Sequence, residues 1–357
     1  MDNSVIHHEE VVDDEKAGKR LDSFVLYFPW QKFDEFLAPS RTQVQKWIRD
    51  GHVTVNEVTQ DNKAYKVRVG ERVVIDVEIE KNPGTPPPQD LDIEIVYQDD
   101  QLIVIDKPPG VSSHAIPSDL KGSVVNFLYH IGTALPPTSH PLRPGIVHRL
   151  DKNTTGLMVI AKSDQAMHEL IEMIKRREVE RKYIALVFGN MPLNSGTIDA
   201  PVGRYQFDRR KMAVTTEKQG RHAKTHYRVL ARYPGFTLVG CKLDTGRTHQ
   251  IRVHLSHLGY PVAGDPYYGG RRIPDKMSRI LKGLDKSEKT DEITEKLNSV
   301  GEILKADLIH LLHAASLQFP HPITNEPLAF KTLPHRKFSD VLGILESIPH
   351  EVVNHEV

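Results

Sequence analysis

Cysteine is almost absent from this chain, which has one, Cys241, among its 357 residues. A single cysteine excludes an internal disulfide and a metal site built from several thiolates. The sequence also has no run of 18 or more apolar residues, so we expect no membrane-spanning helix. Residues 1–15 lack the basic-then-apolar order of a signal peptide. Together these absences predict a protein of the reducing cytoplasm.

The chain also lacks the glycine-rich loop with which many enzymes bind nucleotide phosphates. Three histidines, His249, His254 and His257, lie close together in the sequence. Their spacing matches no common metal site, and no carboxylate or cysteine completes an evident set of ligands. We expect His254 and His257 to flank the apolar side of a helix instead. The sequence therefore predicts no metal site.

Positive and negative charges balance overall, 47 Lys and Arg against 47 Asp and Glu, but their distribution is uneven. Residues 1–15 carry six acids and residues 344–357 carry three, with no Lys or Arg in either stretch. The stretch 203–257 has twelve Lys and Arg against three acids, a net charge of +9. A basic body favours a polyanionic partner such as RNA, because binding releases the counterions of the phosphates. A solvated basic face without a partner would have the same pattern.

Residues 18–80 have the pattern of a small α+β domain. We expect a helix between Ser40, its N-cap, and Gly51, because apolar residues recur there at helical spacing. Two stretches of alternating apolar and polar residues follow the helix, which predicts strands. The exposed side of the helix would carry three cations: Arg41, Lys46 and Arg49.

The same region, "RLDSFV…SRTQVQKWIRDGHVTVNEV…YKVRVGERVVID", resembles the S4 domain, a small RNA-binding module. In S4 domains a pair of helices presents basic side chains to the RNA backbone. The resemblance therefore implies RNA contacts for Arg41, Lys46 and Arg49, without any preference for a base.

The remaining sequence predicts a second, larger domain. Four prolines and a glycine in residues 81–90 indicate an extended linker. Residues 91–340 combine strand-like and helical stretches, for which we expect an α+β domain with a mixed, largely antiparallel sheet. Within it, residues 271–312 are polar and look like a surface insertion with helical pieces. The acidic ends, 1–17 and 341–357, are expected to lie outside both domains.

The stretch "RLDKNTTG", residues 149–156, precedes an apolar run and sets Asp151 between Arg149 and Lys152. An aspartate before Asn-Thr-Thr-Gly is most often a turn residue that caps the backbone. Neighbouring cations, however, keep a carboxylate ionised, and a positioned carboxylate can act as a nucleophile or a base. Taken alone, the residues leave both interpretations open.

Two further residues have chemistry that suits such a site. Arg247 occurs in "LDTGRTHQIRVHLSHLG", at a turn before an expected helix, where it can pair with a carboxylate or contact a phosphate. Tyr183 in "ERKYIALVFG" opens an expected strand. A tyrosine there is usually half-buried packing, but after two cations it also suits a base stacked on an aromatic ring.

Three stretches in this order, "HRLDKNTTGLMVIAK", "ERKYIALVFG" and "LDTGRTHQIRVHL", closely resemble the core motifs of the RluA family of pseudouridine synthases. "PGIVHRLDKNTTGLMVIAKS" and "GDPYYGG" are most similar to its RluD type, which modifies large-subunit rRNA at the stem-loop called helix 69. The resemblance covers residues 18–335 apart from 271–312. It implies an isomerase that moves uracil from an N- to a C-glycosidic bond and needs no cofactor.

The resemblance also implies roles for individual residues. Asp151 would be the essential aspartate, by attack on the ribose C1′ or by elimination to a glycal. Arg247 would form an ion pair with Asp151, and Tyr183 would stack on the target base. Arg149 would fill the gap left in the RNA by the flipped-out nucleotide, whose extrusion costs a few kcal/mol.

Alternatives remain beside large-subunit (23S) rRNA as the partner. A tRNA-modifying member of the same family would have the same motifs, and a non-catalytic RNA-binding or ribosome-assembly factor would have the same fold. A hydrolase with a lone carboxylate lacks a second acid or a metal. We expect a monomer, as in many members of the family, and no membrane partner.

Overall fold

The computed structural model describes residues 3–30, 39, 41–80, 85–116, 119–136, 140, 142–208, 211–269, 273–283, 291–307 and 309–354. The chain divides into two compact units. The first is Met1–Pro86 with the short segments 116–120 and 140–142, and the second is the rest of the chain. The division between Pro86 and Pro87 lies within the proline-rich segment 81–90. No helix among the described residues is long and apolar enough to cross a bilayer.

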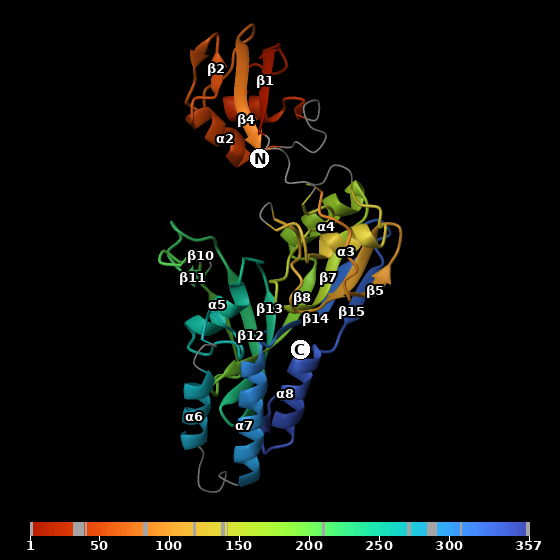
Figure 1. The fold of residues 1–357 in the computed structure, drawn as a ribbon, viewed down its shortest axis with the longest axis vertical. Helices are drawn as coiled ribbons and strands as arrows, with labels where there is room; N and C mark the ends of the chain where they lie inside the picture. Colours follow the sequence, from red (N-terminus) through yellow and green to blue (C-terminus); the bar gives the residue numbers. More distant parts are fainter. Residues whose placement is uncertain are drawn as a thin grey trace. The chain divides into compact units, whose positions relative to one another are not determined.

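The first unit is a four-stranded antiparallel sheet with two short helices (Figure 1). The strand order is β1 (Asn3–Val11), β4 (Arg72–Glu80), β2 (Val53–Val55) and β3 (Val58–Thr59). The helices are α1 (Leu21–Leu26) and α2 (Arg41–Arg49), and they contact one another. As expected, α2 buries Val44, Trp47 and Ile48. Its predicted N-cap, Ser40, lies outside the described residues.

The expected start of this domain at residue 18 is wrong. Strand β1 pairs with β4 along its whole length, from Asn3 opposite Glu80 to Val11 opposite Arg72. The acidic character of the segment hides an alternating pattern, because Ile6 is buried whereas its neighbour His7 is exposed. The N-terminal residues therefore form an edge strand of the sheet rather than an acidic tail.

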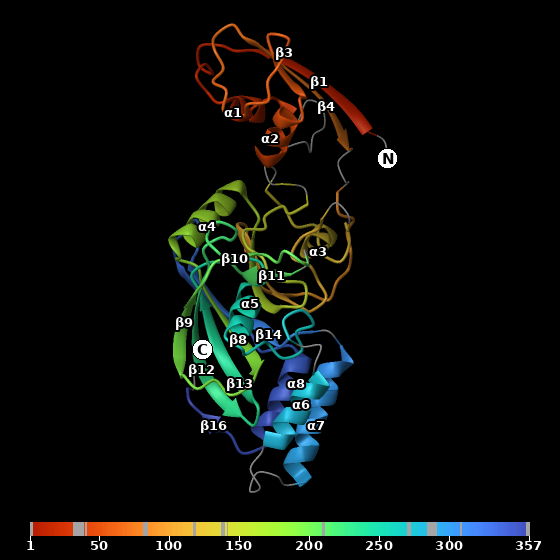
Figure 2. The ribbon, with the colours of Figure 1, turned by 90° about the vertical axis from the view of Figure 1, so that its left-hand side faces the viewer.

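The second unit is built on a ten-stranded sheet (Figures 1 and 2). Along its main path the order is β16-β12-β13-β8-β14-β7-β6-β5, with β9 beside β12 and β15 beside β14. The pairing is antiparallel except between β7 and β14, which are parallel. The bounds are β5 Glu94–Gln98, β6 Leu102–Lys107, β7 Thr155–Ala161, β8 Glu180–Phe188, β9 Ser195–Asp199, β12 Lys224–Tyr233, β13 Phe236–Leu243, β14 Leu312–Pro320, β15 Pro327–Lys331 and β16 Glu351–Val352. A separate hairpin joins β10 (Val202–Arg204) and β11 (Met212–Val214).

Alternation along the strands sends side chains to two apolar layers. Helices α3 (Val124–His130) and α5 (Gln250–His257) contribute to the cluster on one face, which also holds Tyr183. Helix α4 (Asp164–Arg176) packs with the opposite side chains of β6 and β7. Helices α6 (Ile273–Gly283), α7 (Asp291–Ala306) and α8 (Arg336–Glu346) pack with Ile184, Leu186 and Phe188 of β8.

Two expected boundaries in the second unit are wrong. The segment 271–312 is not a polar surface insertion, because α7 buries Leu297, Val300 and Leu304 completely in the cluster of α6 and α8. The C-terminal segment 341–357 is not a free acidic tail either. Helix α8 continues through it to Glu346, and β16 pairs with β12. In both segments polar residues cover the outside of a helix or strand whose apolar side is buried.

The parallel contact between β7 and β14 requires a glycine. Gly156 has φ +110°, and a Cβ atom there would lie 2.4 Å from the carbonyl oxygen of Ala314 on β14. Only a residue without a side chain lets the two backbones approach so closely. Gly156 follows the "RLDKNTT" loop directly, so this contact fixes the loop against β14.

Candidate active site

Asp151 lies in the loop that enters β7. The backbone N–H of Thr154 donates to the carbonyl of Asp151 over 3.0 Å, which closes a tight turn. A fully buried lysine, Lys107, anchors the same loop, because its Nζ donates to the carbonyl of Lys152 over 3.1 Å. Two more carbonyls, those of Pro108 and Val111, accept from the same Nζ at 2.9 Å. Burial lowers the pKa of Lys107 to about 7, because it removes the water around the ammonium group. The three carbonyls accept the hydrogen bonds that water would otherwise accept. The backbone of the loop is thus held by hydrogen bonds that do not use the carboxylate of Asp151.

The cationic partner of Asp151 is Arg252, on α5. Nη1 of Arg252 donates to Oδ2 of Asp151 over 2.9 Å. The other side of the same guanidinium donates to the buried Asp265, from Nε over 2.7 Å and from Nη2 over 3.0 Å. The ring of Tyr268 lies 5.0 Å from the guanidinium carbon of Arg252. Arg252 is therefore locked in place between two carboxylates and an aromatic ring.

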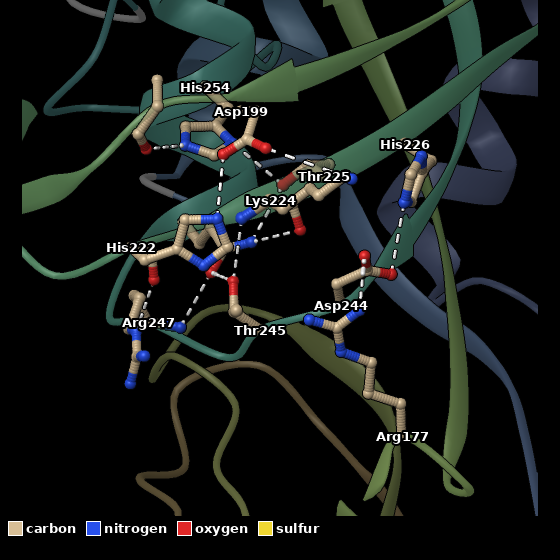
Figure 3. A network of polar contacts seen from close by, with 12 residues as sticks. Arg177, Asp199, His222, Lys224, Thr225, His226, Asp244, Thr245, Arg247 and His254 are labelled. Carbon is tan, nitrogen blue, oxygen red and sulfur yellow. Dashed lines mark hydrogen bonds and ion pairs between the residues drawn. The ribbon is translucent and has the colours of Figure 1, made fainter. Parts of the chain in front are cut away.

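The predicted ion pair between Asp151 and Arg247 is wrong. Nε of Arg247 donates to the backbone carbonyl of His222 over 3.0 Å, and its backbone N–H donates to Gln250 over 3.0 Å (Figure 3). The residue lies in the turn before α5, whereas the pairing arginine lies five residues later, inside the helix. Arg252 lies in the first turn of α5, which begins at Gln250, whereas Arg247 precedes the helix.

The surroundings of Asp151 favour its anionic form. Burial alone would raise the pKa of this carboxyl. Neighbouring His249, Arg252 and His310 and the hydrogen bond from Arg252 outweigh burial and lower the pKa of Asp151 below its usual range. At neutral pH the charge comes from Arg252, because the pKa values of both histidines are themselves lowered, that of His310 to about 3. The second acid, Asp265, also has a lowered pKa, mainly through its hydrogen bond from Arg252 against the opposing effect of burial. Asp151 is therefore ionised at neutral pH although only 14% of its side chain is exposed.

A cavity of about 400 Å³ opens beside Asp151. Oδ2 of Asp151 is held by Arg252, whereas Oδ1 accepts no hydrogen bond from any described residue. Tyr183, 4% exposed, is part of the wall, and burial raises the pKa of its hydroxyl. The apolar part of the wall is formed by Leu150, Leu243, Ile251 and Leu312. An ionised oxygen thus faces a space large enough for a nucleobase.

The rim of the cavity is cationic. Arg143 and Arg149 are exposed and Arg247 is half-buried, and all three line the opening. His249 lies on the inner side, with its Nε2 3.9 Å from Oδ2 of Asp151 and its Nδ1 2.7 Å from the hydroxyl of Tyr268. The described residues include no cluster of His, Cys, Asp or Glu placed to hold a metal ion. The arrangement brings together an anion, an apolar wall and a basic entrance.

In the first unit the three predicted RNA contacts have different surroundings. Arg41 donates to the buried Asp22 from Nε over 3.2 Å and from Nη2 over 3.3 Å. Lys46 and Arg49 line a separate hollow together with Lys63. The side chain of Arg49 is 72% exposed, and its closest acid is Asp50 at 3.5 Å. Lys46 and Arg49 are thus available to a ligand, whereas Arg41 stabilises its own domain.

Sequence reasoning missed Arg252, Asp265 and Lys107. A signal for Arg252 was present in the sequence. It lies on the same predicted helix as Ile251 and Leu255, and an arginine beside such apolar residues needs a carboxylate partner if it is buried. Asp265 follows "PVAG", a stretch with no polar neighbour to suggest an ion pair. Lys107 follows the apolar strand "LIVID", where a lysine is expected to be exposed.

Comparison with known proteins places this site in a family. Residues 101–257 match the RNA pseudouridylate synthase family, and residues 33–73 match the S4 domain. The chain belongs to the RNA pseudouridine synthases: it is 45% identical over 308 residues to the Bacillus subtilis protein named "Uncharacterized RNA pseudouridine synthase YlyB". That alignment covers 84% of this chain and 89% of the relative. The predicted family, the S4 domain, the α+β class and the isomerase activity are confirmed.

Two other similar proteins also cover most of this chain. Ribosomal large subunit pseudouridine synthase D of Escherichia coli K12 is 41% identical over 315 residues, which are 88% of this chain and 86% of that protein. A solved structure, human RNA Pseudouridylate Synthase Domain Containing 4, is similar with a TM-score of 0.51 and 28% identity. It covers 73% of this chain and 94% of the human one.

Proposed function

We propose that this chain converts a uridine of large-subunit rRNA into pseudouridine, and that Asp151 is the residue that acts on the ribose. The single observation that carries the role of Asp151 is its geometry. The carboxylate is ionised, tied by one oxygen to Arg252 and free at the other, beside a cavity of about 400 Å³. The rRNA substrate is supported by the relatives of Pseudomonas aeruginosa and Escherichia coli, both named Ribosomal large subunit pseudouridine synthase D.

In the proposed reaction the target uridine leaves its stem, and its base enters the cavity. The bond between C1′ and N1 breaks, and its electron pair moves to the uracil ring. Asp151 assists as a nucleophile at C1′ or as a base for the proton on C2′, and both routes require the anion that Arg252 maintains. C5 of the rotated base then bonds to C1′, while the bond from Asp151 to C1′ breaks on the first route and C2′ regains its proton on the second. C5 loses its proton and N1 gains one. Atoms balance without a co-reactant.

The other residues of the cavity have supporting roles in this proposal. Tyr183 and the apolar wall hold the detached uracil so that it turns without escaping, at high effective concentration. Arg149, exposed at the rim, fills the place that the flipped nucleotide leaves in the RNA. Arg247 lines the cavity but does not pair with Asp151, because its Nε donates to the backbone carbonyl of His222. In this proposal its guanidinium contacts the RNA backbone.

The S4 unit extends the contact with RNA. Lys46 and Arg49, with Lys63, form a cationic hollow without a buried acid partner, which suits phosphates.

Cys241, the lone cysteine, is buried and its pKa is raised to about 12 by burial, so a reducing compartment is not needed to protect it. We place the reaction in the cytoplasm because that is where an rRNA substrate is found.

The test is a map of pseudouridines across rRNA and tRNA from cells with and without the gene. We expect one or a few positions of large-subunit rRNA, in the stem-loop helix 69, to lose pseudouridine. Wild-type protein should restore them, and Asp151→Asn should bind the same RNA without restoring them. Loss confined to tRNA would overturn the rRNA proposal, and restoration by Asp151→Asn would overturn the role of the aspartate.

A further inference from the structure

Two arginines that line the cavity are buried, Arg181 and Arg252, and they differ in their partners. Arg181 precedes Tyr183 by two residues on β8, so both side chains point to the same face of the sheet and line the cavity. Arg181 is 8% exposed, whereas Arg143 and Arg149 are exposed and Arg247 is half-buried. The other buried arginine of the cavity, Arg252, is paired with Asp151 and Asp265.

The guanidinium of Arg181 has no protein partner among the described residues. Its Nε is buried and donates to no acceptor, and no ion pair joins it to a carboxylate. The acids of the site, Asp151 and Asp265, form their ion pairs with Arg252 and none with Arg181. Glu180, its neighbour on β8, pairs with lysines on the other face of the strand. A buried cation without a counter-ion is costly, so its presence indicates a partner that arrives from outside.

A second buried donor lies in the same cavity. Nε2 of His148 accepts from the backbone N–H of Val159 over 3.1 Å, so the proton of the neutral ring is on Nδ1. That Nδ1 is buried and has no hydrogen-bond partner. Burial, followed by the charge of Arg181, lowers the pKa of His148 to about 3, so the ring is neutral. Two donors without acceptors therefore line the part of the cavity around Arg181.

The chain leaves room beside this guanidinium. Gly246 lies in the turn between β13 and α5, and a Cβ atom there would come within 3.2 Å of Nη1 of Arg181. The φ of Gly246 is not in the left-handed region, so backbone conformation does not demand a glycine there. The absence of a side chain instead keeps Nη1 uncovered.

We propose that Arg181 binds a phosphate group of the target nucleotide within the cavity, an inference that rests on the proposed entry of a uridine. A guanidinium presents two parallel N–H groups to a phosphate and gains most where both ions are shielded from water. A uracil carbonyl is a weaker partner, since it leaves the charge of Arg181 uncompensated. The bound phosphate neutralises the cation and holds the ribose beside Asp151, which makes Arg181 a positioning residue for the reaction.

Stability and binding of Arg181→Met separate this role from a structural one. A structural arginine would destabilise the fold when replaced, whereas an unpaired buried cation exchanged for an apolar side chain should leave the melting temperature unchanged or raise it. Binding of a helix 69 stem-loop should weaken about 10- to 100-fold, as for loss of a hydrogen bond between charged groups. Lys182→Met is the matched control, because it removes the same charge from the opposite face of β8. We expect it to weaken binding by less than about three-fold.

The phosphate is identified with RNAs that carry one methylphosphonate, on the 5′ or the 3′ side of the target uridine. A 2′-O-methyl ribose at the modified linkage prevents strand cleavage, and the all-phosphate reference RNAs carry the same ribose. Dissociation constants are measured in the Asp151→Asn background, with and without Arg181→Met. With one of the two methylphosphonate RNAs, binding should be weakened as much as by Arg181→Met, and the two changes together should cost no more than either alone.

Equal losses from Arg181→Met with both methylphosphonate RNAs and with their all-phosphate references would overturn the phosphate contact, as would binding unchanged by the substitution. A large drop in melting temperature would instead assign Arg181 to the fold and also overturn the proposal. The proposed function fails separately, if the unmodified stem-loop acquires no pseudouridine with wild-type protein.

Discussion

Each unit of this protein buries an aspartate among arginines, and the two carboxylates have different surroundings. Asp22 in the first unit is fully buried and accepts five hydrogen bonds. They come from Arg20, Arg41 and Gln45, and both carboxylate oxygens are used. Hydrogen bonds from these partners lower the pKa of Asp22 well below its usual range, against the effect of burial.

Asp151 also has a lowered pKa but has fewer partners. One hydrogen bond, from Arg252, reaches one of its oxygens, and the other oxygen lies beside a cavity. A carboxylate whose lone pairs are all occupied by fixed donors stabilises a fold, and one that is charged but incompletely bonded can react. The comparison suggests that unfilled acceptor sites, and not the pKa alone, distinguish a reactive buried acid from a structural one.

The largest expected effect comes from Arg252→Met, which leaves Asp151 and Asp265 buried without a counter-ion. We expect the pKa of Asp151 to rise and the single-turnover rate of pseudouridine formation to fall about 100- to 1,000-fold at neutral pH. The second unit should lose about 3–5 kcal/mol of stability, because one partner of a buried pair is removed. RNA modification assays and urea unfolding measure the two effects. A variant with wild-type rate would show that Asp151 does not depend on this arginine.

A smaller effect, confined to stability, is expected from Asp22→Asn. The arginines around Asp22 are about half exposed, so they are rehydrated when the charge is lost. We expect the first unit to lose about 1–3 kcal/mol, the range for hydrogen bonds to a charged group. The rate on saturating RNA should stay within about two-fold of wild type, since Asp22 stabilises only its own unit. A rate loss as large as that of Arg252→Met would contradict the division between structural and reactive carboxylates.

The pH dependence gives a third test. Both aspartates have lowered pKa values in the folded state, so each contributes stability that is present above the unfolded value of about 3.9 and is lost as the pH falls through the folded value. Asp151 should therefore remain ionised from pH 8 to pH 5, and the rate of glycosidic cleavage should change less than about two-fold for this reason. An acid limb near pH 6 in single-turnover kinetics would mean that burial, and not Arg252, controls this carboxyl.

Part of the site was predictable from short motifs, through their resemblance to a family rather than from the chemistry of the residues alone. Asp151 and Tyr183 lie in short motifs with a turn or a strand of their own, and the structure places both at the cavity. Helix α2 was also predictable, since its three buried residues recur at helical spacing. Such features depend on residues close in the chain, where the periodicity of a helix or the chemistry of a turn determines the outcome.

The errors concern contacts between distant residues. Arg247 precedes α5 and Arg252 lies within it, and which of them meets Asp151 depends on how that helix packs in the folded chain. The segment 1–17 was read from its charge, but pairing with β4, more than sixty residues away, makes it a strand. In 271–312 the polar residues outnumber the apolar ones, and burial of α7 depends on α8, which follows it. Composition and charge are weak predictors where the partner is remote in sequence.

The smallest expected effect comes from Tyr183→Phe, which tests whether the reaction at Asp151 requires the hydroxyl of Tyr183 or only its ring. The hydroxyl of Tyr183 donates to no described residue, and the ring packs in the core of the sheet. If the ring alone holds the base, Tyr183→Phe should reduce the single-turnover rate by less than about ten-fold and change stability by less than about 1 kcal/mol. Tyr183→Leu, which removes the aromatic face, is the comparison variant and should lose far more activity; its smaller side chain leaves a cavity in the core, so its rate is measured at a temperature where urea unfolding shows it to be folded. If both variants lose activity equally, the hydroxyl of Tyr183 takes part in the reaction. The reactive carboxylate would then depend on a polar group of the cavity wall, whereas the hydrogen bonds of Asp22 all come from its own unit.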